Sequence, residues 1–272
     1  MISSSHTQAI LIVTQRISKD VIKRYHELES ATAGFGDVFL LYHSKVDSNS
    51  NELEGVKVEA FTDDILENLG YTAIRKTLVP GSNHFPVLKF FNQHPHYQHY
   101  WCIEDDVLFS GNWANFFKVV TPAIDYDFIT SHIRKRAHLP KWPWWKTLSI
   151  PGTPLAREEM LNSFNPIYRI SNKALRHIDL CLKNGSKGHH EVLLPTLLKV
   201  AGFKIADFGA EDNHVTPMLS LCTLRTMRWK PVFILPAKNK NLLYHPAKSK
   251  ITFRQVLVYV KRTIYNQKEY FT

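Results

Sequence analysis

A run of apolar residues that ends in three adjacent acids constrains the fold of this chain more than any other feature. Residues 100–103 are aromatic or apolar, Glu104, Asp105 and Asp106 follow directly, and residues 107–109 are apolar again. An unbroken apolar run of this length is typical of a strand that is buried on both faces, as in parallel sheets. Such sheets bind ligands beyond the carboxyl ends of their strands. We therefore expect the three acids to lie at a ligand-binding edge.

The three acids need a compensating partner. Adjacent carboxylates repel one another, and removing them from water is costly unless a cation or hydrogen-bond donors compensate. Because side chains alternate along an extended chain, Glu104 and Asp106 point to one side and Asp105 to the other. Two carboxylates on one side can hold a hard divalent cation that also binds phosphate oxygens. The alternative is that the acids cap a helix expected near Gly111 and pair with nearby Lys or Arg side chains.

Strands and helices alternate in the first part of the chain. Apolar runs predict strands at residues 9–14, 37–42 and 56–61, and Ser18 is placed to cap a helix between the first two. This alternation predicts an α/β fold with a doubly wound sheet. No glycine-rich dinucleotide fingerprint follows the first strand and no P-loop occurs, which disfavours a dinucleotide oxidoreductase or a P-loop kinase.

The second part of the chain contains an aromatic loop between predicted strands at residues 127–130 and 165–171. Three Trp residues stand among prolines in residues 139–146, a composition that excludes a helix interior. The loop can be a sugar-stacking wall, a lid, a membrane-interface edge, or an ordinarily packed loop. Helices at 173–183 and 189–199 and a strand at 203–207 are predicted next. Residues 251–272 predict an amphipathic helix that packs on the domain or lies on anionic lipid.

Composition limits the classes of partner. The 272 residues suit one large domain, and 34 Lys and Arg against 24 acids give a net charge of +10 that favours anionic partners such as nucleotides. No nucleic-acid-binding signature accompanies this charge, so nucleic acid is not an expected partner. The three cysteines lack C-x-x-C spacing, which predicts reduced thiols. Neither a signal peptide nor a membrane-spanning run is expected.

Taken together, these motifs resemble those of nucleotide-sugar glycosyltransferases of the GT-A type. Residues 104–106 resemble the D-x-D motif of that family, with Glu in place of the first Asp. Residues 167–175 resemble the strand and helix behind the acceptor site. Residues 190–191, which open a helix after a glycine-containing loop, resemble the segment that supplies the acceptor-side acid. Residues 245–248 resemble the late His and Lys that reach the metal and the diphosphate.

The resemblance implies a fold and an activity. The fold would be a GT-A-like, Rossmann-related doubly wound mixed sheet flanked by helices, forming one catalytic domain over residues 1–250. Its donor half would span about residues 1–110 and its acceptor half about residues 111–250, with a C-terminal helix at 251–272. The implied activity is a transfer, dependent on Mn²⁺ or Mg²⁺, from a nucleotide sugar (a UDP sugar is favoured) to a hydroxyl of a glycan or lipid-linked glycan. The implied setting is bacterial surface polysaccharide synthesis, for capsule or lipopolysaccharide, in the cytoplasm or at the inner face of the membrane.

The resemblance also implies roles for single residues. The expected metal ligands are Asp106, Glu104 and His245. The expected donor-binding residues are Glu104, Asp105, Lys248 and Thr14. Glu191 is the expected base, with Asp212 as its rival. Because Glu191 opens a helix, the helix N-terminus should favour its charged form, which is the form a base needs. The alternative role for Glu191 is that of an ordinary acid at a helix start.

Two other functions stay open. A metal-dependent phosphoryl transferase or phosphodiesterase would use the same acids and a second carboxylate cluster, for which Glu211 and Asp212 are the candidates. A non-catalytic carbohydrate-binding protein on the same fold would use the aromatic loop as its surface. A zinc protease of the H-E-x-x-H type is excluded because Leu194 stands where the second His would be.

Overall fold

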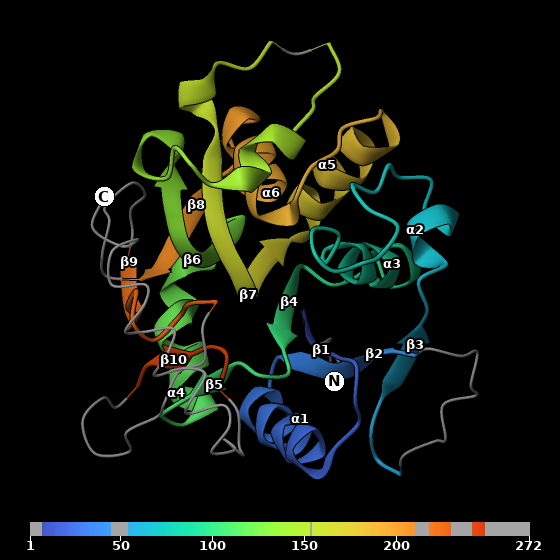
Figure 1. Cartoon of the computed structure of the whole chain (residues 1–272). Helices are drawn as coiled ribbons and strands as arrows, with labels where there is room; N and C mark the ends of the chain where they lie inside the picture. The colour runs from blue at the N-terminus through green and yellow to red at the C-terminus, as the bar shows by residue number, and fades with distance from the viewer. Residues whose placement is uncertain (1–6, 45–53, 153, 210–217, 230–240, 248–272) are drawn as a thin grey trace, which may run out of the picture.

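The computed structural model describes residues 7–44, 54–152, 154–209, 218–229 and 241–247 (Figure 1). The predicted C-terminal helix at 251–272, together with Asp212 and Lys248, lies outside the described residues. Within them, no helix is long and apolar enough to cross a membrane.

An eight-stranded mixed sheet forms the centre of the structure, with the strand order β3-β2-β1-β4-β7-β6-β8-β9. The strands are β1 (Gln8–Thr14), β2 (Gly36–His43), β3 (Val58–Phe61), β4 (His99–Glu104), β6 (Phe128–Lys135), β7 (Leu161–Ser171), β8 (Ile205–Gly209) and β9 (Met218–Cys222). β7 is antiparallel to β4 and to β6, and every other neighbouring pair in this sheet is parallel. A separate two-stranded sheet joins β5 (Leu108–Phe109) to β10 (Leu243–Tyr244). The predicted α/β fold with a mixed sheet and flanking helices is confirmed.

Helices cover both faces of the sheet (Figure 1). α1 (Lys19–Thr32) and α4 (Trp113–Val120) lie on one face. The other face carries α2 (Ile65–Asn68), α3 (Phe85–Gln93), α5 (Asn172–Lys183) and α6 (His190–Val200). Successive residues of β4 therefore enter different cores. Trp101 packs edge-on against Phe116 of α4, with ring centroids 5.6 Å apart, whereas Tyr100 packs against Phe91 of α3 at 5.5 Å. This double burial explains the unbroken apolar run before the acids.

Helix starts show which polar side chains act as caps. The Ser18 hydroxyl accepts a hydrogen bond from the backbone of Val21 at 3.3 Å, as expected for the N-cap of α1. At α5 the cap is Ser171 and not Asn172, because the Ser171 hydroxyl accepts from the Ala174 N–H. The Asn172 amide instead donates to the carbonyls of Pro95 and Tyr97 at 2.7 and 2.8 Å, which ties the start of α5 to the loop before β4.

The aromatic loop belongs to the connection between β6 and β7. This connection contains the short 3-10 turns η2 (Arg136–His138), η3 (Pro143–Thr147) and η4 (Arg157–Glu159). Trp145 is buried, and its indole N–H donates to the Leu139 carbonyl at 2.7 Å. Trp142 and Trp144 lie against the ring of His189, with centroids 5.7 and 4.7 Å from it. The loop therefore packs against the beginning of α6.

The direction of β7 decides which residues gather at the ligand-binding edge. β1, β2 and β4 are parallel and end at the same edge, at Thr14, His43 and Glu104. β7 runs the other way, with Ile167 opposite Ile103, so its first residues lie at that edge. Asn165 and the start of α6 are brought to the acids by this antiparallel strand.

A buried arginine holds the opposite edge of the sheet together. Arg169 of β7 is only 1% exposed, and its guanidinium donates to the carbonyls of Ala123, Ile124 and Tyr126. These carbonyls belong to the turn after α4, where the Ala123 carbonyl also accepts from the Tyr126 N–H at 3.1 Å. Arg169 thus links β7 to the segment that leads into β6.

We expect Arg169→Leu to lower the free energy of unfolding by roughly 2–4 kcal/mol, because it removes the buried charged donor that three carbonyls share. Urea denaturation measures this loss. The matched control is Arg176→Leu on the exposed face of α5, which should change stability by less than about 0.5 kcal/mol. Equal effects of the two substitutions would show that Arg169 has no special structural role.

Candidate active site

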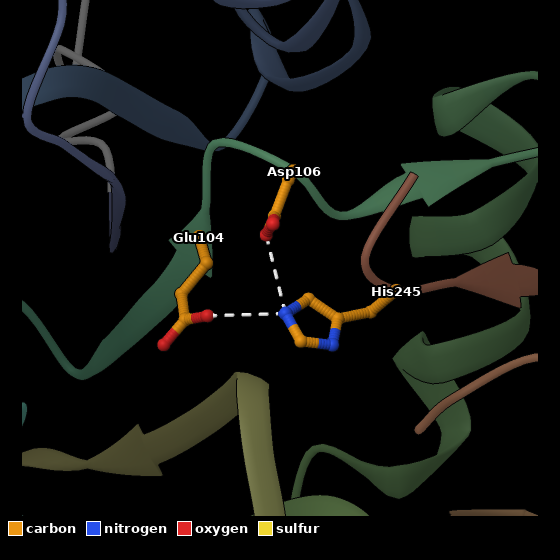
Figure 2. A group of neighbouring side chains, drawn as sticks. All are labelled: Glu104, Asp106 and His245. Carbon is orange, nitrogen blue, oxygen red and sulfur yellow. Dashed lines mark ion pairs between the residues drawn. The ribbon is translucent and has the colours of Figure 1, made fainter. Parts of the chain in front are cut away.

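Three predicted metal ligands meet at the end of β4. Glu104 is the last residue of β4, Asp106 lies two residues further on, and His245 follows β10 (Figure 2). The Nε2 atom of His245 is 3.3 Å from Glu104 Oε2 and 3.2 Å from Asp106 Oδ1. One ligand atom from each residue lies within 4.8 Å of the others. Residues separated by about 140 positions in the sequence therefore form one cluster.

Backbone contacts aim the imidazole of His245 at the two carboxylates. β10 pairs with β5, the strand that follows the acids, and the Ala247 N–H donates to the Asp106 carbonyl at 2.8 Å. The Nδ1 atom of His245 lies 3.1 Å from the Arg228 carbonyl, which can only accept, so this nitrogen carries a proton. A histidine oriented in this way presents Nε2 as the ligand atom, as at many metal sites.

The cluster fits a hard divalent cation. Burial opposes the charge on the imidazole, but the hydrogen bonds and charges of Asp106 and Glu104 outweigh it and raise the pKa of His245 to about 9. The imidazole therefore holds a proton between the two carboxylates. A divalent cation in the same place would be stabilised more strongly, because it carries two positive charges. Neighbouring ligands of an ion with bonds of 2.0–2.6 Å lie about 3 Å apart, close to the measured Nε2–oxygen distances. Two carboxylates and one imidazole suit Mn²⁺ or Mg²⁺.

Asp105, in the turn between Glu104 and Asp106, is not a member of this cluster. It accepts a short hydrogen bond from the Thr14 hydroxyl at the end of β1. Burial raises the pKa of Asp105, and its neighbours Asp106 and Glu104 raise it further, while Thr14 and Arg24 lower it. The structure thus brings the expected donor-binding residues Thr14 and Asp105 to each other at the edge of the sheet.

A pocket opens beside Glu104 at the same edge. It is lined by Val13, Gln15, His43, Phe61, Leu78, Val79, Asn83, Pro86, Cys102, Glu104, Asn165 and Tyr168. The rings of His43 and Phe61 are stacked, with centroids 5.0 Å apart and planes 5° apart. The Asn83 amide donates to Glu104 Oε1 at 3.3 Å, which connects the pocket wall to the metal cluster. Asn83 and Asn165 were not singled out from the sequence. Asn165 directly precedes Pro166, and Asn83 follows Pro80 by three residues; nothing else in the sequence marks them.

Glu191 lies in the first turn of α6, with its side chain 16% exposed. Its backbone N–H donates to His189 Nδ1 at 3.3 Å, so the His189 ring caps the helix. The proline at position 195 has no N–H for the Glu191 carbonyl, and the Ser163 hydroxyl lies 3.5 Å from that oxygen. The Asn165 amide donates to the His190 carbonyl at 3.3 Å. The first residues of β7 therefore fix the backbone around Glu191.

The expectation that the helix N-terminus keeps Glu191 charged is wrong for this environment. Burial, followed by the charge of Glu104, raises the pKa of Glu191 to about 8. The contribution of Glu104 also shows that Glu191 lies within electrostatic range of the metal cluster. Asp212, the rival candidate for the base, and the candidate phosphate-binding Lys248 lie outside the described residues.

Three buried histidines surround the start of α6. His84, His189 and His190 are each no more than 5% exposed, and the His190 ring lies 6.3 Å from His84 and 4.9 Å from His189. From the sequence alone, His189 is expected to be a solvated neighbour of His190 and Glu191, and its burial shows that this expectation is wrong. Burial lowers the pKa of His84 to about 3 and that of His189 to about 4, and it lowers the pKa of His190 as well. All three rings are neutral at neutral pH.

No protein-family model and no curated protein matches the chain. Several solved structures are similar. Glucosyl-3-phosphoglycerate synthase from Mycobacterium tuberculosis, in complex with Mn²⁺, UDP and glucosyl-3-phosphoglycerate, is 12% identical, with a TM-score of 0.43 over 78% of this chain and 74% of that one. The galactosyltransferase LgtC, in complex with donor and acceptor sugar analogues, is 11% identical, with a TM-score of 0.41 over 74% and 73% of the two chains.

A further similar structure is described as a mycobacterial protein. It is 12% identical, with a TM-score of 0.42, and the match covers 74% of this chain and 64% of that one, a little under two thirds of its length. All three TM-scores lie below 0.5. Likenesses at this level do not establish a shared activity, so the function has to be argued from the residues of this chain.

We expect the buried histidines to make the protein sensitive to acid. The pKa of His84 is about 3 in the folded protein against an ordinary value of 6.5, so folding disfavours its protonation. Its neutral state contributes stability above pH 6.5, and this contribution is lost as pH falls from 6.5 towards 3, by up to about 1.4 kcal/mol per pH unit. His84→Leu should therefore reduce the number of protons taken up on unfolding by about one in this pH range. The unfolding free energy of the variant then depends less steeply on pH. Urea denaturation between pH 6.5 and 4 measures it, with the exposed His96→Leu as control. An unchanged pH dependence in His84→Leu would contradict the prediction.

Proposed function

We propose that the chain is a metal-dependent glycosyltransferase that moves a sugar from a nucleotide sugar, preferentially a UDP sugar, to a hydroxyl acceptor. One observation carries this proposal: Glu104 belongs both to the three-ligand cluster and to the lining of the adjacent pocket. A diphosphate in contact with a cation at the cluster would place the rest of a nucleotide in that pocket. Glu191, on the neighbouring helix, would face the acceptor.

The roles follow from the charges that develop in the reaction. The bond from the anomeric carbon to the diphosphate breaks, and the sugar passes through an oxocarbenium-like state. Glu104, Asp106 and His245 would hold a divalent cation, which neutralises the charge that forms on the leaving phosphate. Glu191 would accept the proton of the acceptor hydroxyl while the oxygen of that hydroxyl forms the new bond to the anomeric carbon. A base whose pKa lies near the working pH is suited to this task.

We extend the proposal to a glycan or lipid-linked glycan as the acceptor, used in bacterial surface polysaccharide synthesis in the cytoplasm or at the inner face of the membrane. The motif resemblance over about residues 8–250 supports this setting. The net charge of +10 agrees with anionic substrates and with contact to an anionic membrane.

A phosphoryl transferase or phosphodiesterase with two metal ions is the less favoured function. Such an enzyme needs a second group of carboxylates. In the part of the chain that the structure describes, Glu104, Asp106 and His245 form the single group of three that could hold a metal ion. Glu211 and Asp212, the candidates for a second cluster, lie outside it.

Thermal-shift titration with UDP, GDP and CMP, each with and without Mn²⁺, tests the proposed function. We expect UDP together with Mn²⁺ to raise the melting temperature more than either alone, since a ligand that binds only the folded state stabilises it. Asp106→Asn should weaken the Mn²⁺-dependent binding of UDP at least about 100-fold, because it removes a direct metal ligand. Asp125→Asn removes the same charge at an exposed position and is the control. Unchanged Mn²⁺-dependent binding in Asp106→Asn would remove this residue from the metal site.

The role of Glu191 predicts a loss of turnover without a loss of donor binding. Glu191→Gln should lower the rate of UDP release from a UDP sugar by roughly 10²–10⁴-fold, the usual contribution of a general base. The affinity for UDP and Mn²⁺ should stay the same, because Glu191 would contact the acceptor. Glu27→Gln on the exposed side of α1 is the control. If turnover were retained in full, the base would have to be Asp212, or the mechanism would be a retaining one without a base here.

A further inference from the structure

An exposed arginine extends the candidate active site beyond Glu191. The guanidinium carbon of Arg75 lies over the ring of Trp144, 5.1 Å from its centroid. The Trp144 ring is stacked on His189, with centroids 4.7 Å apart and planes 27° apart. The Nδ1 atom of His189 is 3.8 Å from Glu191 Oε2. A stack of Arg75, Trp144 and His189 therefore leads from the surface to the residue next to the candidate base.

Several contacts hold the middle of this stack in place. The His189 N–H donates to the Thr147 hydroxyl at 2.9 Å, and that hydroxyl donates to the Trp144 carbonyl at 2.6 Å. Ser149 and Lys187 exchange two backbone hydrogen bonds of 2.8 and 2.9 Å. The loop that carries Trp144 is thus attached, just after the tryptophan, to the segment that leads into α6. Trp144 offers Arg75 a fixed platform.

Arg75 has a charge and a set of donors with no partner in the described part of the chain. No carboxylate there lies within ion-pair distance of Arg75, and no hydrogen bond to its guanidinium is found among those residues. Stacking fixes the plane of a guanidinium and leaves the N–H groups at its edge directed outwards. That geometry matches the two oxygens of a carboxylate or phosphate.

The surroundings of Arg75 are also basic. Lys76 follows it, and Lys141 and Lys146 flank the stacked tryptophans. All three side chains are exposed, as is Lys187. None of these lysines takes part in an ion pair with a residue that the structure describes. Several cations gathered on one surface raise the local concentration of anionic ligands.

We propose that Arg75, held on Trp144, binds an oxyanion carried by the acceptor, so that the acceptor is an acidic sugar or a sugar phosphate. That the bound molecule is the acceptor rests on the proposed function, whereas the oxyanion site itself does not. Arg75 is connected to Glu191 through Trp144 and His189, and in this proposal it holds an anionic group of an acceptor whose hydroxyl faces Glu191. This binding needs no metal ion, in contrast to the binding of a nucleotide diphosphate at Glu104 and Asp106.

Three matched hexoses test the site in the presence of EDTA: glucose, glucose 6-phosphate and glucuronate. Their affinities for the full chain can be measured by ligand-observed NMR titration. We expect at least one of the two charged sugars to bind about tenfold or more tightly than glucose. Arg75→Gln should weaken that binding roughly 10–100-fold, the usual effect of losing hydrogen bonds to a charged group. Preference for glucose 6-phosphate identifies a phosphate site, and preference for glucuronate identifies a carboxylate site.

Two further variants separate geometry from charge. Arg75→Lys keeps the charge and loses the planar fork, so its affinity should lie between those of the wild type and Arg75→Gln. Lys199→Gln removes one positive charge at the exposed far end of α6 and should bind like the wild type. Equal binding of the three sugars to the wild type, or undiminished binding to Arg75→Gln, would overturn the proposal.

The same proteins distinguish this proposal from the proposed function. UDP and Mn²⁺ should bind Arg75→Gln as they bind the wild type, because Arg75 lies outside the metal cluster and the pocket lining. If no protein bound UDP with Mn²⁺ while charged sugars still bound through Arg75, the proposed function would fail and the oxyanion site would stand. The reverse result would leave the glycosyltransferase proposal and remove the anionic acceptor.

Discussion

Repulsion between the carboxylates at the end of β4 is the constraint on which the rest of the site depends. β4 ends at Glu104, and the turn that follows, closed by the Val107 N–H to the Glu104 carbonyl at 3.0 Å, brings Asp106 to the same place as Glu104. There each carboxylate raises the energy of the other unless a positive group intervenes. The chain supplies that group from a distant segment. β10 pairs with β5 directly after the acids, and this pairing places the His245 ring between the two carboxylates. The cluster is therefore already arranged around a positive charge.

The antiparallel strand β7 determines what faces this cluster. In a sheet of parallel strands alone, the residues that begin a strand would lie at the edge away from the acids. β7 is inserted in the opposite direction between β4 and β6, so Ser163 and Asn165 lie at the same edge as Glu104. Both contact backbone carbonyls at the start of α6. A single reversed strand thus brings α6, which carries Glu191 in its first turn, to the edge of the sheet where Glu104 lies.

Local patterns in the sequence predicted most of the strands and helices, whereas the grouping of Glu104, Asp106 and His245 came from the motif resemblance. Apolar runs and alternation depend on neighbouring residues, and the structure follows them closely. The properties that the sequence did not reveal depend on tertiary burial. Asn is a common residue at helix caps, but the Asn172 amide donates a hydrogen bond to the loop before β4, and Ser171 caps α5 instead. His189 looks like a polar neighbour, yet the tryptophan loop covers it.

Magnitudes explain why the charge state of Glu191 was mispredicted. A helix N-terminus stabilises a carboxylate by about 0.3–1 kcal/mol, which corresponds to less than one pKa unit. Burial and the nearby charge of Glu104 act in the opposite direction and raise the pKa of Glu191 from 4.5 to about 8, so they dominate. Because Glu104 both belongs to the three-ligand cluster and repels Glu191, any change of charge at Glu104 changes the proton affinity of Glu191. The two halves of the site are coupled through this one carboxylate.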